Sequence, residues 1–174
     1  MTRMVTLSPN DVGLWKQYLA KANEHKRIRS EVLKVCRANQ DVMVELLKGS
    51  LVSPSEKDAA LDFVRSVNVE AQKELFDELL PLASDLDVGS VNRAEQILLA
   101  LPRDWLRERL AGAIQRYLDE PDLITPELLS LCFQVDRTLA HRLAERAAGS
   151  DNKDRRDLGD FFLQKLEQQT MDRI

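Results

Sequence analysis

The sequence predicts an all-α protein, and three observations lead to that prediction. Apolar residues recur at intervals near 3.6 residues throughout the chain, whereas the alternation expected of a half-buried strand is absent. Charged residues make up 31% of the chain and aromatic residues only 5%, which is typical of amphipathic helices with solvated outer faces. Pro9, Pro54 and Pro102 each begin a predicted helix and recur about every 45 residues. We therefore expect one domain over residues 1–174, a stack of about nine or ten helices.

Three helices are expected in the first fifty residues, over 8–22, 26–37 and 41–49. Ser8 and Asp11 resemble a capping box at the first start, and Gly49 is expected to end the third helix. Apolar residues at helical spacing mark the faces that we expect to be core. They are Val12, Trp15, Tyr18, Leu19, Ala22, Ile28, Val32, Val35, Cys36, Val42 and Leu46.

The strongest predicted helix boundary lies at Ser53-Pro54-Ser55-Glu56, which has the residues of a complete capping box. In such a box the Ser53 hydroxyl accepts a hydrogen bond from the Glu56 backbone N–H, and the Glu56 carboxylate reaches back to residue 53. We therefore expect a helix to begin there and to bury Ala60, Leu61, Val64 and Val67.

The later helix starts are marked by capping residues or by proline. They are expected at Asn68, Pro102, Thr125, Asp136 and either Asp151 or Asn152. The helix capped by Asn68 is expected to continue to residue 80, and residues 84–90 to form a loop before a helix over 91–101. The helix after Pro102 is the longest and reaches about Leu118. The expected core of the last helices is Leu106, Leu110, Ala113, Tyr117, Leu128, Leu129, Cys132, Leu139, Leu143, Leu158, Phe161, Phe162 and Leu166.

One junction carries a recognisable pattern, over residues 144–166. A helix ends in small residues, an acidic turn follows, and Asp154, Arg156 and Gly159 open the next helix. This pattern resembles a HEAT-type repeat, with two departures: Arg155 stands where that family has a small apolar residue, and Gly159 where it has alanine. The resemblance implies a HEAT-like α-solenoid, an α-α superhelix that presents a long curved surface to partners.

Charge is segregated along the chain, although the net charge is only −4. Residues 1–50 carry nine basic and five acidic groups, a net of +4, whereas residues 51–101 carry four and ten, a net of −6. An acidic total argues against a general nucleic-acid binder, because neutralisation of phosphates is the main source of sequence-independent affinity. A local basic patch remains compatible with this composition.

The sequence predicts a cytoplasmic protein. No segment approaches the roughly 18 to 20 consecutive apolar residues that a membrane helix needs, and the N-terminus lacks the apolar stretch of a secretory signal. Cys36 and Cys132 lie on apolar faces far apart in the sequence, which indicates two reduced core thiols.

No recognisable catalytic constellation is present in the sequence. His25 and His141 are more than a hundred residues apart, and there is no metal-binding histidine or cysteine motif and no glycine-rich phosphate loop. Arg137 and Glu145 flank His141 at helical spacing, which is typical of an ordinary surface histidine. We therefore expect no enzymatic activity, no cofactor and no metal.

Two surfaces are candidates for binding. The first is a basic stripe of Lys26, Arg27, Lys34 and Arg37, which fall within about 100° of one another and opposite the apolar face. It would contact an acidic protein or phosphates, and its alternative role is that of a solubilising outer face.

The second surface comprises Trp105, Arg109, Gly112 and Arg116, which lie within roughly 60° on the longest helix, beside its core stripe. Tryptophan and arginine are enriched at binding hot spots, so this sector suits an interface. In the alternative, Trp105 packs under a neighbouring helix and the arginine stems cover its edge.

These features together predict a non-enzymatic protein–protein interaction module, an adaptor, an inhibitor or an immunity-type protein that uses one face of its helical stack. A helical-repeat protein that binds nucleic acid through a local basic surface is the alternative. The alternative requires the basic stripe to converge with Arg103, Arg107, Arg109 and Arg116 on one concave face.

Overall fold

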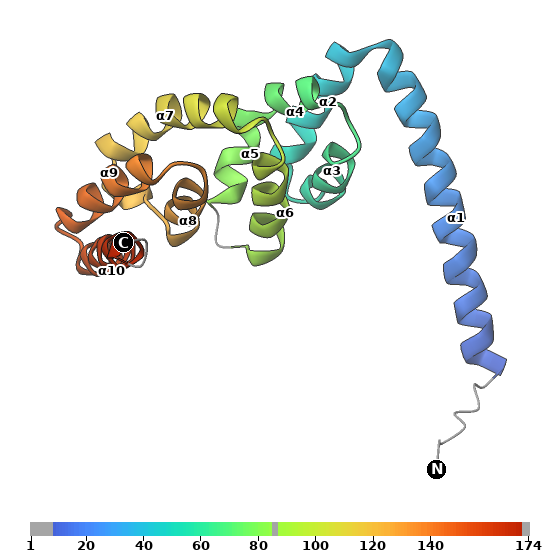
Figure 1. Cartoon of the computed structure of the whole chain (residues 1–174). Helices are drawn as coiled ribbons and strands as arrows, with labels where there is room; N and C mark the ends of the chain where they lie inside the picture. The colour runs from blue at the N-terminus through green and yellow to red at the C-terminus, as the bar shows by residue number, and fades with distance from the viewer. Residues whose placement is uncertain (1–8, 85–86, 172–174) are drawn as a thin grey trace. The chain divides into compact units, whose positions relative to one another are not determined.

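The structure, a computed structural model, describes the backbone of residues 9–84 and 87–171. The regular elements within these ranges are all helical, which confirms the predicted all-α class (Figure 1). The chain divides into two compact units, residues 1–43 and residues 44–174. The helices are α1 (Pro9–Ala38), α2 (Gln40–Val52), α3 (Lys57–Val64), α4 (Val69–Glu74), α5 (Phe76–Ala83), α6 (Val88–Leu99), α7 (Arg103–Asp119), the 3₁₀ turn η1 (Pro121–Leu123), α8 (Pro126–Val135), α9 (Arg137–Ala148) and α10 (Lys153–Met171).

Side-chain caps confirm four of the predicted helix starts. The Asn68 Oδ1 accepts from the backbone N–H of residue 71 at 2.8 Å, and the Thr125 Oγ1 from that of residue 128 at 3.2 Å. The Asp136 Oδ1 accepts from the N–H of residue 138 at 2.7 Å, and the Asn152 Oδ1 from that of residue 154 at 2.9 Å. Each cap satisfies an N–H that has no partner within its own helix.

The predicted capping box at residue 53 is wrong. The α3 helix begins at Lys57, and its N-cap residue Glu56 makes no side-chain capping hydrogen bond. The Ser53 carbonyl, not its hydroxyl, accepts from the N–H groups of Glu56 and Lys57, at 3.1 and 2.9 Å. The Glu56 carboxylate accepts from the Ser50 hydroxyl at 2.8 Å, so it is held by the end of α2.

Three further boundaries differ from the prediction. The helix expected over 68–80 is interrupted at Leu75, whose backbone (φ −94°, ψ 6°) bends the chain while Leu75 and Phe76 are both buried. The α6 helix begins at Val88 because Asp87 caps it, accepting from the Gly89 N–H at 3.3 Å. The α2 helix continues through the expected stop at residue 49 and ends at Val52.

The described helices of residues 44–174 pack against their neighbours and bury most of the apolar side chains of the unit. The α6 helix packs against α3 and α5, α7 against α8 and α9, and α9 against both α8 and α10. Most apolar positions predicted in these helices are buried, whereas Phe161 is exposed. The largest side chains that are fully buried are Leu51, Leu61, Leu75, Phe76, Leu79, Leu98, Leu106, Leu110, Ile114, Ile124, Leu128 and Leu129.

Among the described glycines, Gly159 is the one that another backbone approaches most closely, at the point where α9 and α10 cross. A Cβ added to Gly159 of α10 would lie 2.6 Å from the Ala144 carbonyl oxygen and 2.8 Å from the Ala148 Cα, and would also collide with the Ala148 backbone nitrogen. Glycine is therefore required where the two backbones meet. The turn before α10 is held by Arg156, whose Nη1 donates to the carbonyls of Ser150 and Asp151 at 2.8 and 2.7 Å.

Of the two cysteines, Cys132 is a buried free thiol, as predicted. Burial raises the pKa of Cys132 to about 12, with a smaller contribution from the Asp136 carboxylate, so the thiol stays protonated in neutral solution. The Cys36 side chain lies outside the described residues.

The prediction for the first unit needs two corrections. The two helices expected over 8–22 and 26–37 are one continuous helix of 30 residues, α1. Its apolar face is not core: Trp15, Tyr18 and Val35 are 59%, 61% and 64% exposed. The others expected to be buried there are also exposed, namely Val12, Leu19, Ile28 and Val32, with Ala22 half-buried. Amphipathic spacing identifies a face that favours burial, but the described residues of this unit contain no second helix lying along it.

The α2 helix likewise buries a different face from the one expected. Val42 and Leu46 are exposed, whereas Met43, Val44, Leu47 and Leu51 are buried. Both sets are spaced for one side of a helix, so periodicity alone could not choose between them.

Candidate protein-binding surfaces

The most extensive exposed apolar feature of α1 is a set of five side chains that we call the α1 apolar stripe. It comprises Leu14, Tyr18, Ile28, Val32 and Val35, all of which are exposed. They fall within about 100° of arc on an ideal helix. The Trp15 ring lies next to the stripe and stacks on the Tyr18 ring, with 5.2 Å between centroids and an interplanar angle of 19°.

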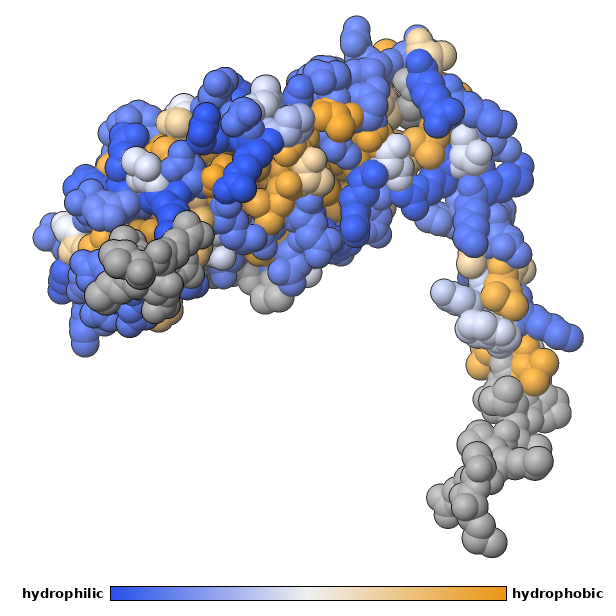
Figure 2. Space-filling model, viewed as in Figure 1, coloured by the Kyte–Doolittle hydropathy of each residue, from blue (hydrophilic) through white to orange (hydrophobic). Residues whose placement is uncertain are grey.

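Figure 2 shows apolar residues at the surface of α1, among hydrophilic ones. Contiguous exposed apolar surface is uncommon on soluble proteins and marks binding sites. The prediction missed this surface because it assigned four of the five residues, all except Leu14, to the core. Residues 22–26, Ala-Asn-Glu-His-Lys, contain neither glycine nor proline. The absence of these helix-breaking residues was the signal that the helix continues between its two apolar segments.

The predicted basic stripe lies on the opposite side of α1. Lys26, Arg27, Lys34 and Arg37 are all exposed. Arg27 forms an ion pair within the helix, because its Nη1 lies 3.1 Å from the Glu31 Oε1. Both partners are solvated, so this pair contributes little to stability. The structure thus brings these four residues of the predicted site together on one helix face.

The predicted Trp105 sector lies on α7 and contacts α4 and α5. Trp105 is half-buried, and its ring meets the buried Phe76 ring edge-on, with centroids 5.8 Å apart. The Arg109 guanidinium lies 5.4 Å from the Phe76 centroid, and its Nη2 pairs with the Asp77 Oδ2 at 2.6 Å. Arg116 is exposed and lies about 10 Å beyond Arg109 along the helix axis. Trp105 and Arg109 are therefore brought together around Phe76, and Arg116 is not.

The other arginines of α7 are occupied by polar groups of the protein. Arg103 donates to the carbonyls of Gln134 and Val135, at 3.3 and 3.4 Å, and Arg107 lies 3.6 Å from Asp104. Residues 44–174 carry 17 basic and 25 acidic groups, a net charge of −8. Phosphate binding needs an excess of positive charge, so these observations disfavour nucleic acid as a ligand of α7.

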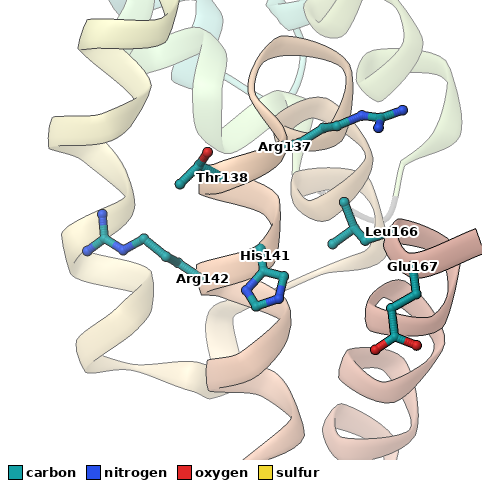
Figure 3. Close-up of a pocket in the computed structure, with 6 residues that line it drawn as sticks. All are labelled: Arg137, Thr138, His141, Arg142, Leu166 and Glu167. Atoms are coloured by element: carbon teal, nitrogen blue, oxygen red, sulfur yellow. The ribbon is translucent and has the colours of Figure 1, made fainter. Parts of the chain in front are cut away.

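A hollow of about 380 Å³ lies between α9 and α10 (Figure 3). Its charged groups diverge, since the Arg137 and Arg142 side chains point in opposite directions in the figure. The His141 Nδ1 lies 3.3 Å from the Glu145 Oε2, one helical turn further along α9, and both side chains are exposed. Its lining residues are Arg137, Thr138, His141, Arg142, Leu166 and Glu167. The arrangement lacks the convergent polar groups that acid–base or nucleophilic catalysis requires.

A second hollow, of about 450 Å³, is lined by residues of α2, α3 and α5. Leu51, Val52, Pro81 and Leu82 supply apolar walls, and the Glu78 carboxylate supplies a polar group. The Glu78 Oε2 is buried and has no hydrogen-bond partner among the described residues. No local sequence pattern predicted this hollow, because its walls come from three separate helices.

Comparison with known proteins finds no matching family model, no similar curated protein and no matching solved structure. Among the described residues, no helix is both long and apolar enough to cross a membrane. The same residues contain no group of three or more histidine, cysteine, aspartate or glutamate side chains placed to hold a metal ion.

Proposed function

We propose that this chain is a cytoplasmic, non-enzymatic protein–protein interaction module, an adaptor, an inhibitor or an immunity-type protein, which binds its partner through α1. One observation carries the proposal: the members of the α1 apolar stripe are between 41% and 64% exposed. Helices in proteins owe most of their stability to packing of an apolar face against another element. A partner that covers the stripe therefore stabilises α1 and removes apolar surface from water.

In this proposal, residues 44–174 form a HEAT-like helical stack. Two features support that architecture, the succession of short helices packed on their neighbours and the Arg156 side chain that bridges the turn before α10. The Asp154, Arg156 and Gly159 positions are those on which the resemblance to HEAT repeats rests. A stack of this kind is a rigid platform for an interaction element.

The basic stripe has a complementary role in this proposal. The charges of Lys26, Arg27, Lys34 and Arg37 lie away from the apolar stripe, where they keep the exposed helix soluble. Peripheral charges of this kind change association rates and salt dependence more than they change affinity. An acidic surface flanking the partner's apolar site would therefore bind α1 faster than a basic one.

Affinity capture with matched variants tests the proposal. The full tagged chain is compared with Ile28→Asp, which places a charge within the stripe, and with Ser30→Asp, which places the same charge at an exposed position on another side of α1. Proteins bound specifically should be lost with Ile28→Asp and retained with Ser30→Asp, because only the first substitution puts a carboxylate into an apolar contact.

Equal recovery of every specifically bound protein by the wild type and Ile28→Asp would contradict binding through α1. Circular dichroism spectra of the two variants provide the control, since both should retain the helical content of the wild type.

A further inference from the structure

We propose that α1 pairs with α1 of a second copy of this chain, in an antiparallel two-stranded coiled coil centred near Asn23. This inference rests on the proposed function, because it names a partner for the same apolar stripe. Three independent features of α1 carry it: the period of the stripe, its symmetry about the middle of the helix, and the placement of its charges.

The period of the stripe points to a helical partner. Residues 14, 18, 21, 25, 28, 32 and 35 are separated alternately by four and three residues, and five of these seven positions are the stripe itself. A repeat of seven residues drifts about 20° per repeat on a straight helix, so a stripe with this period follows a left-handed path. Another helix can wind along such a path. A flat lipid surface would instead match a stripe that runs straight along one side of the helix, which this stripe does not.

The stripe is also nearly symmetric about residue 23. Leu14 and Val32 each lie nine residues from Asn23, and Tyr18 and Ile28 each lie five residues from it. In an antiparallel pair with this centre, Leu14 of one copy faces Val32 of the other, and Tyr18 faces Ile28. A two-fold axis repeats each contact, so one surface of α1 is complementary to itself.

Charge selects the antiparallel orientation over the parallel one. The two polar core positions are Lys21 and His25, both exposed on α1. A parallel pair in register would place Lys21 against its own copy, which is repulsive. The antiparallel pair places Lys21 of each helix opposite His25 of the other, so the two lysines do not face each other. The basic stripe lies on the outer side of both helices, where water screens its charge.

The area available suits a modest, reversible dimer. Five exposed apolar side chains per helix, each losing on the order of 100 Å² of surface, bury about 1,000 Å² in total, at the lower limit for specific interfaces. The stacked rings of Trp15 and Tyr18 add to this surface at one end of the stripe. Dimerisation should therefore depend on protein concentration in the micromolar range.

Sedimentation velocity of the full chain, over about 1 to 200 µM, tests the pairing. The wild type should shift from monomer to dimer as its concentration rises, and Ser30→Asp should do the same. Ile28→Asp should remain monomeric throughout, because it places two carboxylates in the apolar layers of the dimer. Thermal unfolding of residues 44–174, followed by circular dichroism, should give the same transition in all three proteins, because both substitutions lie outside that unit.

Cysteine cross-linking tests the orientation. Tyr18→Cys and Ile28→Cys are prepared separately, each with Cys36→Ser, then mixed and oxidised. The antiparallel pair predicts a disulfide between the two different chains, whereas a parallel pair predicts disulfides between identical chains.

A wild type that stays monomeric at the highest concentration overturns the inference, as does a dimer that survives Ile28→Asp or cross-links in parallel. Binding of the monomer to anionic phosphatidylserine vesicles would instead identify a bilayer as the occupant. The proposed function is tested independently of dimerisation. It is contradicted if affinity capture recovers the same proteins with the wild type and with Ile28→Asp.

Discussion

At the scale of single residues, the consequence of adding one methyl group depends on what surrounds it. Gly159 meets the backbone of α9, and backbone atoms cannot move aside as a flexible side chain can. Gly159→Ala should therefore lower the free energy of unfolding by about 1 to 3 kcal/mol, the usual cost of overpacking. Chemical denaturation monitored by circular dichroism measures this change.

Gly112 is the matched control, because a Cβ at this exposed position of α7 would meet nothing within 4 Å. Gly112→Ala should raise the free energy of unfolding by about 0.5 to 1 kcal/mol, since alanine restricts the unfolded chain and favours helix. Equal effects of the two substitutions would mean that α9 and α10 do not approach closely at Gly159.

The sequence left two roles open for Trp105: an anchor at an interface, or a side chain packed within the fold. Its ring lies edge-on against the buried Phe76, with the Lys73 Nζ 5.7 Å from its centroid. Trp105→Ala should lower the free energy of unfolding by about 2 to 4 kcal/mol, because it removes an aromatic pair and part of the apolar packing. Partner capture through α1 should be unchanged. A stable variant that loses its partner would instead identify Trp105 as an anchor, the role that its neighbouring arginines suggested.

At the scale of elements, Asp87 ties the start of α6 to α3. Its Oδ2 lies 2.9 Å from the Lys57 Nζ and accepts from the Ser90 hydroxyl at 2.8 Å. These two interactions, led by Lys57, lower the pKa of Asp87 from 3.8 to about 2. Because the folded-state pKa is the lower one, the stabilisation is complete above about pH 4 and is lost as the pH falls to about 2.

Asp87→Asn tests this linkage, because asparagine can still cap a helix but cannot carry the charge. The variant should be less stable than the wild type above about pH 4, and the difference should shrink as the pH falls towards 2. Urea denaturation across this pH range measures it. A difference that stays constant with pH would contradict the lowered pKa of Asp87.

Capping was the most reliable element-scale signal in the sequence. Asn68, Thr125, Asp136 and Asn152 each make the expected hydrogen bond, because a cap depends on residues only two or three positions away. Glu56 failed as a capping residue because a hydroxyl from the preceding helix, that of Ser50, competes for its carboxylate. Such competition depends on how two helices meet and could not be predicted from spacing.

At the scale of the whole molecule, the all-α class followed from periodicity, whereas the location of the core did not. Leu110 and Val32 are both placed at helical spacing, yet Leu110 is fully buried and Val32 is exposed. The difference lies in whether another helix is present to cover the face, which a periodic pattern does not contain. The candidate site on α1 was missed for this reason, although the basic stripe on the same helix is exposed, as the sequence indicated.

The division into two units leads to a last prediction. The described side chains of α1 are exposed or half-buried, whereas the buried part of α2 begins at Met43 and belongs with the following helices. Removal of residues 1–37 should therefore shift the thermal midpoint by no more than about 4 °C, the shift that roughly 1 kcal/mol gives in a domain of this size. The shortened chain should still unfold in one cooperative transition, and it should be monomeric at every concentration. Loss of cooperative unfolding would mean that α1 contributes to the core of residues 44–174, in which case its apolar stripe is not available to a second copy.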